Sequence, residues 1–296
     1  MSLQRRTSLR SWFARNAAYH IYTAVLFTWT DYKTIFFPVL AFGSGTAPVQ
    51  SSANFWNACI WVWWHLLLCN VSNQANSKNE DALNRPWRPL PSGRVSCSQA
   101  VALRKVMVAI CIALSAVYGF GTIAFSSMIV FTTVLYDECG LARHPIGKNF
   151  CNICGYTAFQ AGATLLLGGT RVLDQLSIAA VGLSGMIIFT TVQLQDFPDQ
   201  AGDAAIGRVT FPIYAPEFSR VFTLVAMGSW SILLGRYWGI GVVSRCCLFA
   251  IGMLVGIRCF AYRTSAADTI TYRMYNVWLM AAFLLPLHAR RGILYI

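Results

Sequence analysis

Two short stretches, residues 73–81 and 196–203, concentrate side chains that could hold a divalent metal ion. Each follows a long apolar run, and together they contain five of the chain's 11 acidic residues: Glu80, Asp81, Asp196, Asp199 and Asp203. On a helix, positions spaced i, i+4, i+8 or i, i+3, i+7 lie on one face, so each stretch can point a row of oxygen ligands in one direction. Carboxylate and amide oxygens are hard ligands of the kind that Mg²⁺ prefers. The spacing therefore predicts a magnesium site beside apolar segments, at a membrane surface.

Basic side chains accompany both acidic stretches. Lys78, Arg85, Arg88 and Arg94 lie in or after the first stretch, and Arg208 follows the second. Carboxylates that hold Mg²⁺, together with Arg and Lys side chains that neutralise the remaining charge, are what a diphosphate group requires. A single charged loop is commonly an ordinary solvated surface. Two such loops in a chain this poor in acids favour a binding site.

The composition places most of the chain in a lipid bilayer. Of its 296 residues 56% are hydrophobic and 11% charged, and the mean hydropathy is +0.52, outside the range of soluble domains. A helix that spans a bilayer needs roughly 17–25 apolar residues. We predict one all-α polytopic membrane domain over residues 1–296, with about nine transmembrane helices around a central cavity. Their approximate bounds are 31–49, 53–70, 101–120, 121–137, 150–169, 176–195, 217–235, 241–262 and 271–289.

Residues 1–30 are expected to form a cytosolic or interfacial segment. From about residue 12 the segment combines Arg15 and His20 with a set of aromatic side chains: Trp12, Phe13, Tyr19, Tyr22 and Trp29. Such a mixture suits a helix that lies in the membrane interface. A longer first spanning helix is the alternative.

The distribution of Lys and Arg predicts the orientation of the chain. With a cytosolic N-terminus, 18 of the 23 Lys and Arg residues fall on the cytosolic side, as the positive-inside rule requires, and both acidic stretches face the cytosol. The net charge of +12 then reflects topology and some capacity for anionic lipid or substrate, so no nucleic acid partner is needed to explain it. The ten scattered cysteines complete no zinc set, even at Cys151 and Cys154, and suit a reducing compartment. We expect a multi-pass protein of the endoplasmic reticulum membrane.

The strings around these residues resemble the signatures of the UbiA superfamily of intramembrane prenyltransferases. The first signature of that family, Asn-x3-Asp-x3-Asp, is matched here by Asn73, Ser77 and Asp81. It is followed by the highly specific string Arg88-Pro-Leu-Pro-Ser-Gly93. The second signature, Asp-x2-Asp-x3-Asp, is present intact as Asp196, Asp199 and Asp203. Tyr136 and Lys148 resemble the family's Tyr and Lys in the loop after the fourth helix, and together the matches cover most of the chain.

The resemblance implies a role for each matching residue. The cofactor Mg²⁺, and through it a diphosphate, would be bound by Asn73, Asp81, Asp196, Asp199 and Asp203. Ser77 stands where the family usually has Asp, and a hydroxyl is the weaker magnesium ligand, so the first site would rely on Glu80 and Asp81 or bind its ion through water. The diphosphate would be contacted by basic side chains: Lys33, Lys78, Arg85, Arg88, Lys148 and Arg208. The catalytic residues would be Asp81, Asp199, Tyr136 and Lys148.

Two reactions are open to such a site, and both begin with metal-assisted loss of diphosphate from an allylic chain, which leaves a carbocation. The variant first signature and the string Asp196-Phe-Pro-Asp199 are more similar to the membrane-bound sesquiterpene cyclases of fungi, of the bergamotene-forming type, than to the prenyltransferases. We therefore expect farnesyl diphosphate as substrate, a cyclic sesquiterpene as product, and downstream biosynthetic enzymes as partners. The alternative is transfer of the prenyl chain onto an aromatic or meroterpenoid acceptor. A non-catalytic transporter is disfavoured, because the ionisable groups crowd to one side of the predicted helices.

Overall fold

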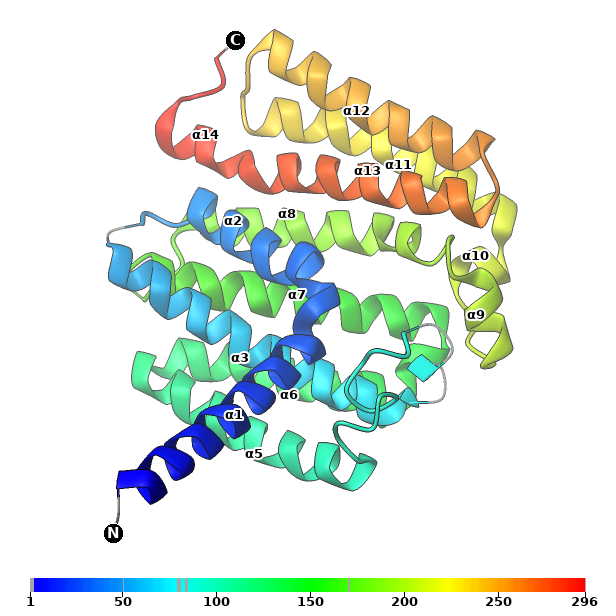
Figure 1. Ribbon diagram of the computed structural model, residues 1–296. Coiled ribbons are helices and arrows are strands. Elements are labelled where there is room, and N and C mark those ends of the chain that lie inside the picture. The colour runs from blue at the N-terminus through cyan, green and yellow to red at the C-terminus, as the bar shows by residue number, and fades with distance from the viewer. Residues whose placement is uncertain (1–2, 50, 79–80, 83–84, 170, 296) are drawn as a thin grey trace.

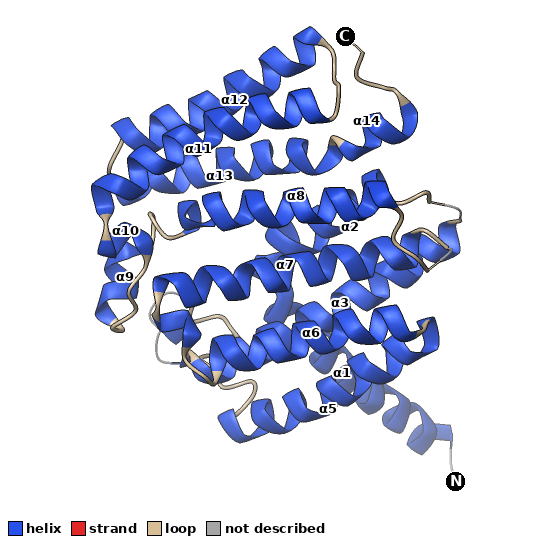
Figure 2. Ribbon diagram, turned by 180° about the vertical axis from the view of Figure 1, so that it is seen from behind, coloured by secondary structure: helices blue, strands red, loops and turns tan. Residues whose placement is uncertain are grey.

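The computed structural model describes residues 3–49, 51–78, 81–82, 85–169 and 171–295, and every regular element within them is a helix (Figure 1, Figure 2). The long elements are α1 (Leu3–Thr28), α2 (Phe37–Thr46), α3 (Ser52–Asn76), α5 (Cys97–Tyr118), α6 (Phe120–Asp137), α7 (Pro145–Leu167), α8 (Gln175–Thr191), α11 (Pro216–Tyr237), α12 (Val242–Ala261) and α13 (Ser265–Leu284). The short ones are η1 (Trp29–Asp31), η2 (Tyr32–Phe36), η3 (Leu141–Arg143), η4 (Val192–Gln195), α9 (Gln200–Ala205), α10 (Phe211–Tyr214) and α14 (Pro286–Arg291). The predicted all-α class is confirmed.

Each predicted spanning segment coincides with a helix, although several bounds differ. Within the described residues, five segments are long and apolar enough to cross a membrane: Cys97–Tyr118, Phe120–Asp137, Gln175–Gln195, Pro216–Tyr237 and Val242–Ala261. The total of nine spans stays a prediction. The second predicted span ended at residue 70, whereas α3 continues to Asn76, so the start of the first acidic stretch lies on a helix. The first predicted span begins irregularly, with the 3-10 turn η1 and the π-helical turn η2 ahead of α2.

Local sequence signals explain where several helices begin. Ser96 caps α5 through a capping box, in which Gln99 N–H donates to Ser96 Oγ at 3.2 Å and Ser96 N–H donates to Gln99 Oε1 at 2.9 Å. Asp174 caps α8 by accepting from Ser177 N–H at 2.9 Å. Gly119, with φ of 114°, adopts a backbone conformation that other residues rarely take, and so lets the chain reverse between α5 and α6.

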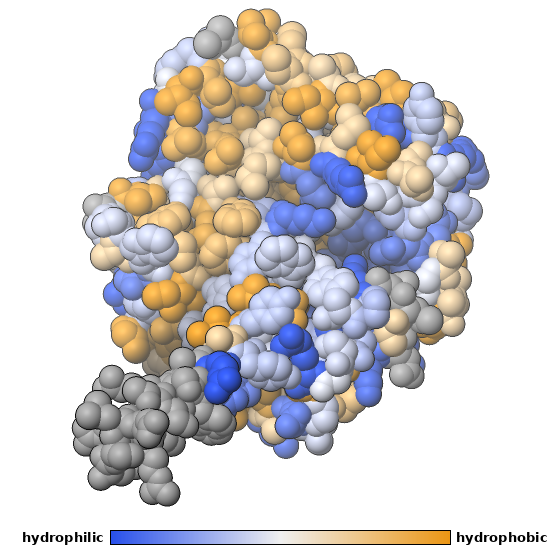
Figure 3. Space-filling model, in the orientation of Figure 1, coloured by the Kyte–Doolittle hydropathy of each residue, from blue (hydrophilic) through white to orange (hydrophobic). Residues whose placement is uncertain are grey.

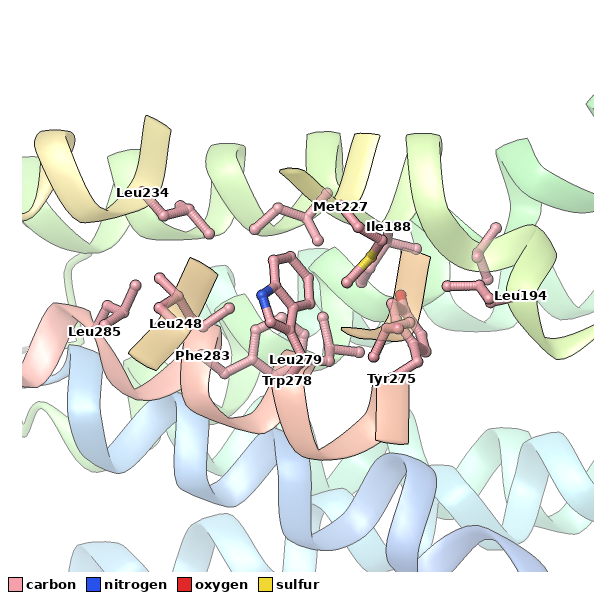
Figure 4. Close-up of a cluster of buried hydrophobic side chains, with 14 of the residues drawn as sticks. Ile188, Leu194, Met227, Leu234, Leu248, Tyr275, Trp278, Leu279, Phe283 and Leu285 are labelled. Carbon is pink, nitrogen blue, oxygen red and sulfur yellow. The ribbon is translucent and has the colours of Figure 1, made fainter. Parts of the chain in front are cut away.

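The long helices pack side by side into an apolar bundle. Helices α11, α12 and α13 form one neighbouring group, α2 joins that group to α7, and α7 contacts α3, α6 and α8. Trp278 lies at the centre of the largest buried cluster, among Ile188, Met227 and Phe283, and donates its indole N–H to Ser231 Oγ at 3.0 Å (Figure 4). Two further clusters join α2, α3 and α7, and α1, α3 and α5. The polar segments that connect the helices therefore lie at the ends of the bundle, outside these apolar clusters.

Those connections meet at one end of the bundle. The loop after α3 and the short helices α9 and α10 lie together at the right of Figure 1, away from both chain termini. The second acidic stretch is anchored there by a buried cation. The guanidinium of Arg220 lies 4.4 Å from the ring centroid of Phe197, which stands between Asp196 and Asp199, and donates to both carboxylate oxygens of Asp268 at 3.1 and 2.9 Å. The α11–α13 group thus positions the second acidic stretch.

The Arg220–Asp268 pair is fully buried, so breaking it should destabilise the fold. Asp268→Ala leaves the guanidinium uncompensated, and we expect a loss of about 3–5 kcal/mol in unfolding free energy. Replacing both partners by apolar residues, Arg220→Met with Asp268→Leu, should recover most of it. Thermal unfolding of detergent-purified protein measures the effect. Arg263→Met, which breaks the exposed pair with Glu217, is the control and should melt almost like the unmodified chain. Equal melting of the Asp268 and Arg263 variants would contradict the expectation.

Candidate functional site

A cavity of about 770 Å³ lies at the loop end of the bundle. Its walls come from segments far apart in the sequence: η1 and η2, α3, α6, α7, the 195–208 region and α13. Six of the chain's 11 acidic residues line it: Asp31, Asp81, Asp137, Asp196, Asp199 and Asp203. Five basic residues line it as well: Lys33, Arg85, Arg88, Lys148 and Arg208. Hydrophilic side chains gather around a hollow on this side of the molecule (Figure 3).

The first acidic stretch presents a row of oxygen-bearing side chains to the cavity, on one face as its spacing predicted. Asn73 lies in the last turn of α3, and the helical pattern of backbone hydrogen bonds continues past it, from Ser77 N–H to Asn73 O at 3.0 Å and from Asp81 N–H to Ser77 O at 2.9 Å. Asn73, Ser77 and Asp81 therefore share one face and all line the cavity. The Asn73 amide nitrogen also donates to Asp137 Oδ1, at the end of α6, at 3.2 Å.

Asp81 is buried and paired with Arg88. Arg88 donates to Asp81 Oδ1 at 2.6 Å and to Thr30 Oγ1 at 3.2 Å, so it links the loop after α3 to η1, which contains Thr30. Burial raises the pKa of the Asp81 carboxyl, although the neighbouring Arg88 and Arg85 oppose that shift. The backbone that follows turns back through Ser92 N–H to Arg88 O at 3.0 Å, which holds Arg88 in place.

The second acidic stretch is held by Lys148 and Arg208. Asp196 follows η4, Asp199 stands directly before α9, and Asp203 lies inside that helix. The Lys148 ammonium, in the first turn of α7, lies 2.6 Å from Asp196 Oδ1 and 4.0 Å from Asp203 Oδ2. Arg208 donates to Asp203 Oδ1 at 3.0 Å. Two carboxylates are thus neutralised at the cavity wall, while Asp199 is exposed at its rim.

The cavity becomes apolar as it extends along α7 into the bundle. Lys148, Cys151, Gly155 and Phe159 lie on one face of α7, and the 11 helical steps from the first to the last correspond to about 16 Å of helix. The other side chains of this apolar arm include Ile35, Leu66, Ile129, Tyr156 and Tyr272. Phe159 in turn packs against Trp61, and their ring centroids lie 6.2 Å apart. Gly162 permits this packing, because a Cβ there would lie 2.3 Å from the Trp61 ring.

Most residues that the sequence singled out line this one cavity. They are Lys33, Asn73, Ser77, Asp81, Arg85, Arg88, Tyr136, Lys148, Asp196, Asp199, Asp203 and Arg208. Lys78 is exposed and does not line the cavity, and Glu80 lies outside the described residues.

Sequence reasoning missed several lining residues. Asn70 lies one turn before Asn73 on the same face of α3, and Asp137 directly follows Tyr136 at the end of an apolar segment. Both signals were present in the sequence. No signal pointed to Tyr272, because its place in the wall depends on how α13 packs.

The donor set of the cavity suits a magnesium ion that is shared with phosphate. Among the described residues, no three His, Cys, Asp or Glu side chains form a ready-made metal site. Mg²⁺ is usually bound through one or two carboxylates and completes its shell with phosphate and water. Asp203 Oδ2 is buried and accepts no hydrogen bond from the described residues. A buried acceptor without a donor costs free energy that a cation would recover.

Comparison with known proteins relates the chain to one family. A sequence model described as "UbiA prenyltransferase family" matches residues 34–280. The chain is 30% identical over 273 residues to fumagillin beta-trans-bergamotene synthase of Aspergillus fumigatus, covering 90% of this chain and 92% of that protein. It is 26% identical to somaliensene A/B synthase of Streptomyces somaliensis, covering 96% of this chain and 98% of that protein. It is also 26% identical to a polyprenyl transferase of Hericium erinaceus, covering 84% of this chain and 88% of that protein.

The fold is shared with solved structures. A UbiA homolog from Archaeoglobus fulgidus bound to GPP and Mg²⁺ superimposes with a TM-score of 0.63, covering 89% of this chain and 99% of that one. At 13% identity the likeness shows the fold alone.

Removing Lys148 should leave the buried carboxylate of Asp196 uncompensated, whereas Asp203 keeps its pair with Arg208. We expect Lys148→Met to lower the unfolding free energy by about 3–5 kcal/mol and Lys148→Arg, which keeps the charge, to lower it less. Thermal unfolding in detergent measures both. Lys105→Met, at an exposed position of α5, is the matched control. If Lys148→Met and Lys105→Met melted alike, the ion pair would not have the role assigned to it.

Proposed function

Because the chain belongs to the UbiA prenyltransferase family, we propose that it is a Mg²⁺-dependent terpene cyclase of membranes, which ionises farnesyl diphosphate and cyclises the farnesyl chain to a sesquiterpene hydrocarbon. The observation that carries the proposal is a single cavity that joins a rim of carboxylates and cations to an apolar, aromatic arm. A prenyl diphosphate has the same two parts, a dianionic or trianionic head and a hydrocarbon chain. The head would lie at the rim and the chain in the arm.

The rim residues divide into metal ligands and phosphate ligands. Mg²⁺ would be held by the side chains of the two acidic stretches: Asn73, Ser77, Glu80, Asp81, Asp196, Asp199 and Asp203. Once bound, the ion supplies charge neutralisation and Lewis acidity to the departing diphosphate. The diphosphate oxygens would accept hydrogen bonds from basic side chains: Lys33, Lys78, Arg85, Arg88, Lys148 and Arg208. Of these, Lys148 and Arg208 already lie beside Asp196 and Asp203, where they could stabilise the negative charge that develops on the departing diphosphate.

Ionisation breaks the bond between the allylic carbon and the diphosphate oxygen, and both electrons leave with the diphosphate. The carbocation then lies where the rim meets the arm, near Tyr136. The rings of Tyr156, Phe159 and Tyr272 offer negative π faces to the positive charge, and the apolar wall excludes water that would otherwise capture it. The double bonds of the chain attack the cation, and loss of a proton, which the released diphosphate can accept, completes the hydrocarbon.

Two relatives with nearly full-length alignments support cyclisation over transfer. Both are named as synthases of terpenes, and one is 30% identical to this chain. The second candidate function is transfer of the prenyl chain onto an aromatic or meroterpenoid acceptor, which the similarity to a polyprenyl transferase favours. In either case we place the enzyme in the endoplasmic reticulum membrane with the cavity rim facing the cytosol, where a hydrocarbon product could pass to downstream biosynthetic enzymes.

The cyclase proposal predicts activity without an acceptor. Purified protein given farnesyl diphosphate and Mg²⁺ alone should release a cyclic C15 hydrocarbon and one diphosphate per turnover, detected by gas chromatography with mass spectrometry and by a diphosphate assay. Excess EDTA should stop both, and added Mg²⁺ should restore both. If product formed only after an aromatic acceptor was supplied, the transferase would be the correct assignment.

Loss of a metal ligand should stop turnover without unfolding the protein. We expect Asp199→Ala to lower kcat by about a hundredfold or more, because Asp199 would hold Mg²⁺ against the leaving group. Its melting temperature should barely change, since the side chain is exposed. Glu138→Gln, an exposed acid outside the cavity lining, is the control and should keep full activity. Near-normal turnover by Asp199→Ala would show that this carboxylate is not a ligand.

A further inference from the structure

We propose that Asp137, the last residue of α6, is a ligand of the first magnesium ion and supplies the carboxylate that is missing at Ser77. The inference rests on the proposed function, since it concerns the metal that the reaction would use. It adds Asp137 of α6 to the predicted ligands of the first acidic stretch, where Asp137 would bind the ion together with Asn73 of α3.

The contact between Asp137 and Asn73 orients an amide oxygen toward the cavity. Both residues line the cavity, and the Asn73 amide nitrogen donates to Asp137 Oδ1 at 3.2 Å. A carboxylate can only accept, so it must face the NH₂ end of the amide and leave Asn73 Oδ1 as the acceptor that is free for a cation. Since Mg²⁺ is bound through oxygen, Asp137 both fixes the useful rotamer of Asn73 and adds a charged ligand beside it.

The position of Asp137 in α6 is electrostatically unfavourable without a cation. Carbonyl dipoles make the C-terminus of a helix negative, and the last turn of α6 contains no basic residue. The next residue, Glu138, adds a second negative charge. The nearby Arg104 forms an ion pair with Glu138 and not with Asp137. Among the described residues Asp137 makes no ion pair. Its negative charge is compensated by the neutral Asn73 amide and Ser72 hydroxyl and, from beyond ion-pair distance, by Arg104.

Asp81 and Ser77, the neighbouring side chains of the first acidic stretch, already form an ion pair or hydrogen bonds. Asp81 is paired with Arg88 at 2.6 Å. The Ser77 hydroxyl donates to Asn73 O at 2.9 Å and reaches Asp81 Oδ2 at 3.4 Å. On the opposite wall, Lys148 and Arg208 compensate Asp196 and Asp203. Asp137 is thus a carboxylate near Asn73 that keeps its charge available for a metal ion, and it stands on the helix next to the position that lacks one. On the opposite wall Asp203 Oδ2 is buried and accepts no hydrogen bond from the described residues, although the Lys148 ammonium lies 4.0 Å away, so this oxygen could also bind a cation.

The test measures metal binding directly, without turnover. Detergent-purified protein is titrated with Mn²⁺ in the presence of inorganic diphosphate, and free Mn²⁺ is followed by its EPR signal. Removing a charged ligand in Asp137→Asn should weaken Mn²⁺ binding by about 10- to 100-fold. Ser77→Asp added to that variant should return the affinity to within about threefold of the unmodified chain, because the carboxylate is restored from the other helix. Glu138→Gln, which removes the adjacent acid outside the cavity, should change the affinity less than about twofold.

The outcomes separate this inference from the proposed function. If the unmodified chain bound no Mn²⁺ with diphosphate, the proposed function itself would fail. If the unmodified chain bound Mn²⁺ and Asp137→Asn bound it equally well, only the present inference would fail. It would also fail if Glu138→Gln had the same effect as Asp137→Asn, or if Ser77→Asp did not compensate.

Melting temperatures show whether each variant is folded. Should Asp137→Asn not fold, the single variant Ser77→Asp decides the question. With Asp137 already serving as ligand, the added carboxylate should raise Mn²⁺ affinity less than about threefold, whereas a site that truly lacked a carboxylate should gain about tenfold or more.

Discussion

Charge buried at the end of an apolar bundle must be compensated, and this requirement governs how the loop end of the structure is assembled. Asp81 is compensated by Arg88, Asp196 by Lys148 and Asp203 by Arg208. An uncompensated carboxylate in such a place would cost several kcal/mol, so each pair also fixes the backbone segments that carry its two partners. Ion pairs therefore hold the cavity wall together, although most of the molecule is held together by apolar packing.

The apolar bundle in turn decides where those charges can lie. The α11–α13 group reaches the second acidic stretch through the Arg220 guanidinium, which is placed over the Phe197 ring, and through Ser265, whose hydroxyl donates to Pro198 O at 2.8 Å. Tyr272, one turn after Asp268 on α13, lines the cavity on the same side. Packing far from the rim thus sets both the position of the acidic stretch and the shape of the apolar arm.

The same ion pairs that hold the cavity wall together suit the chemistry proposed for it. If a diphosphate and a magnesium ion were bound as proposed, Arg88 and Lys148 would pair with phosphate oxygens and the carboxylates with the metal ion. Asp81, Asp196 and Asp203 would then have an oppositely charged partner both with and without the ligand. The charges of the rim suit a diphosphate together with its metal ion, and the apolar arm suits a hydrocarbon chain.

The sequence by itself determined the features that depend on local spacing. Composition placed the chain in a membrane, the apolar runs located the helices, and the helical spacing put Asn73, Ser77 and Asp81 on one face, as the structure confirms. Irregular starts such as η1 and η2 could not be predicted, because they depend on how the chain passes α3. Likewise, only the tertiary structure decided which distant groups meet. Lys148 reaches Asp196 across 48 positions and Asp137 reaches Asn73 across 64, and Tyr272 enters the wall only through the packing of α13. Spacing along a helix is fixed by its period, whereas contacts between helices are fixed by how their apolar faces pack, which no single segment encodes.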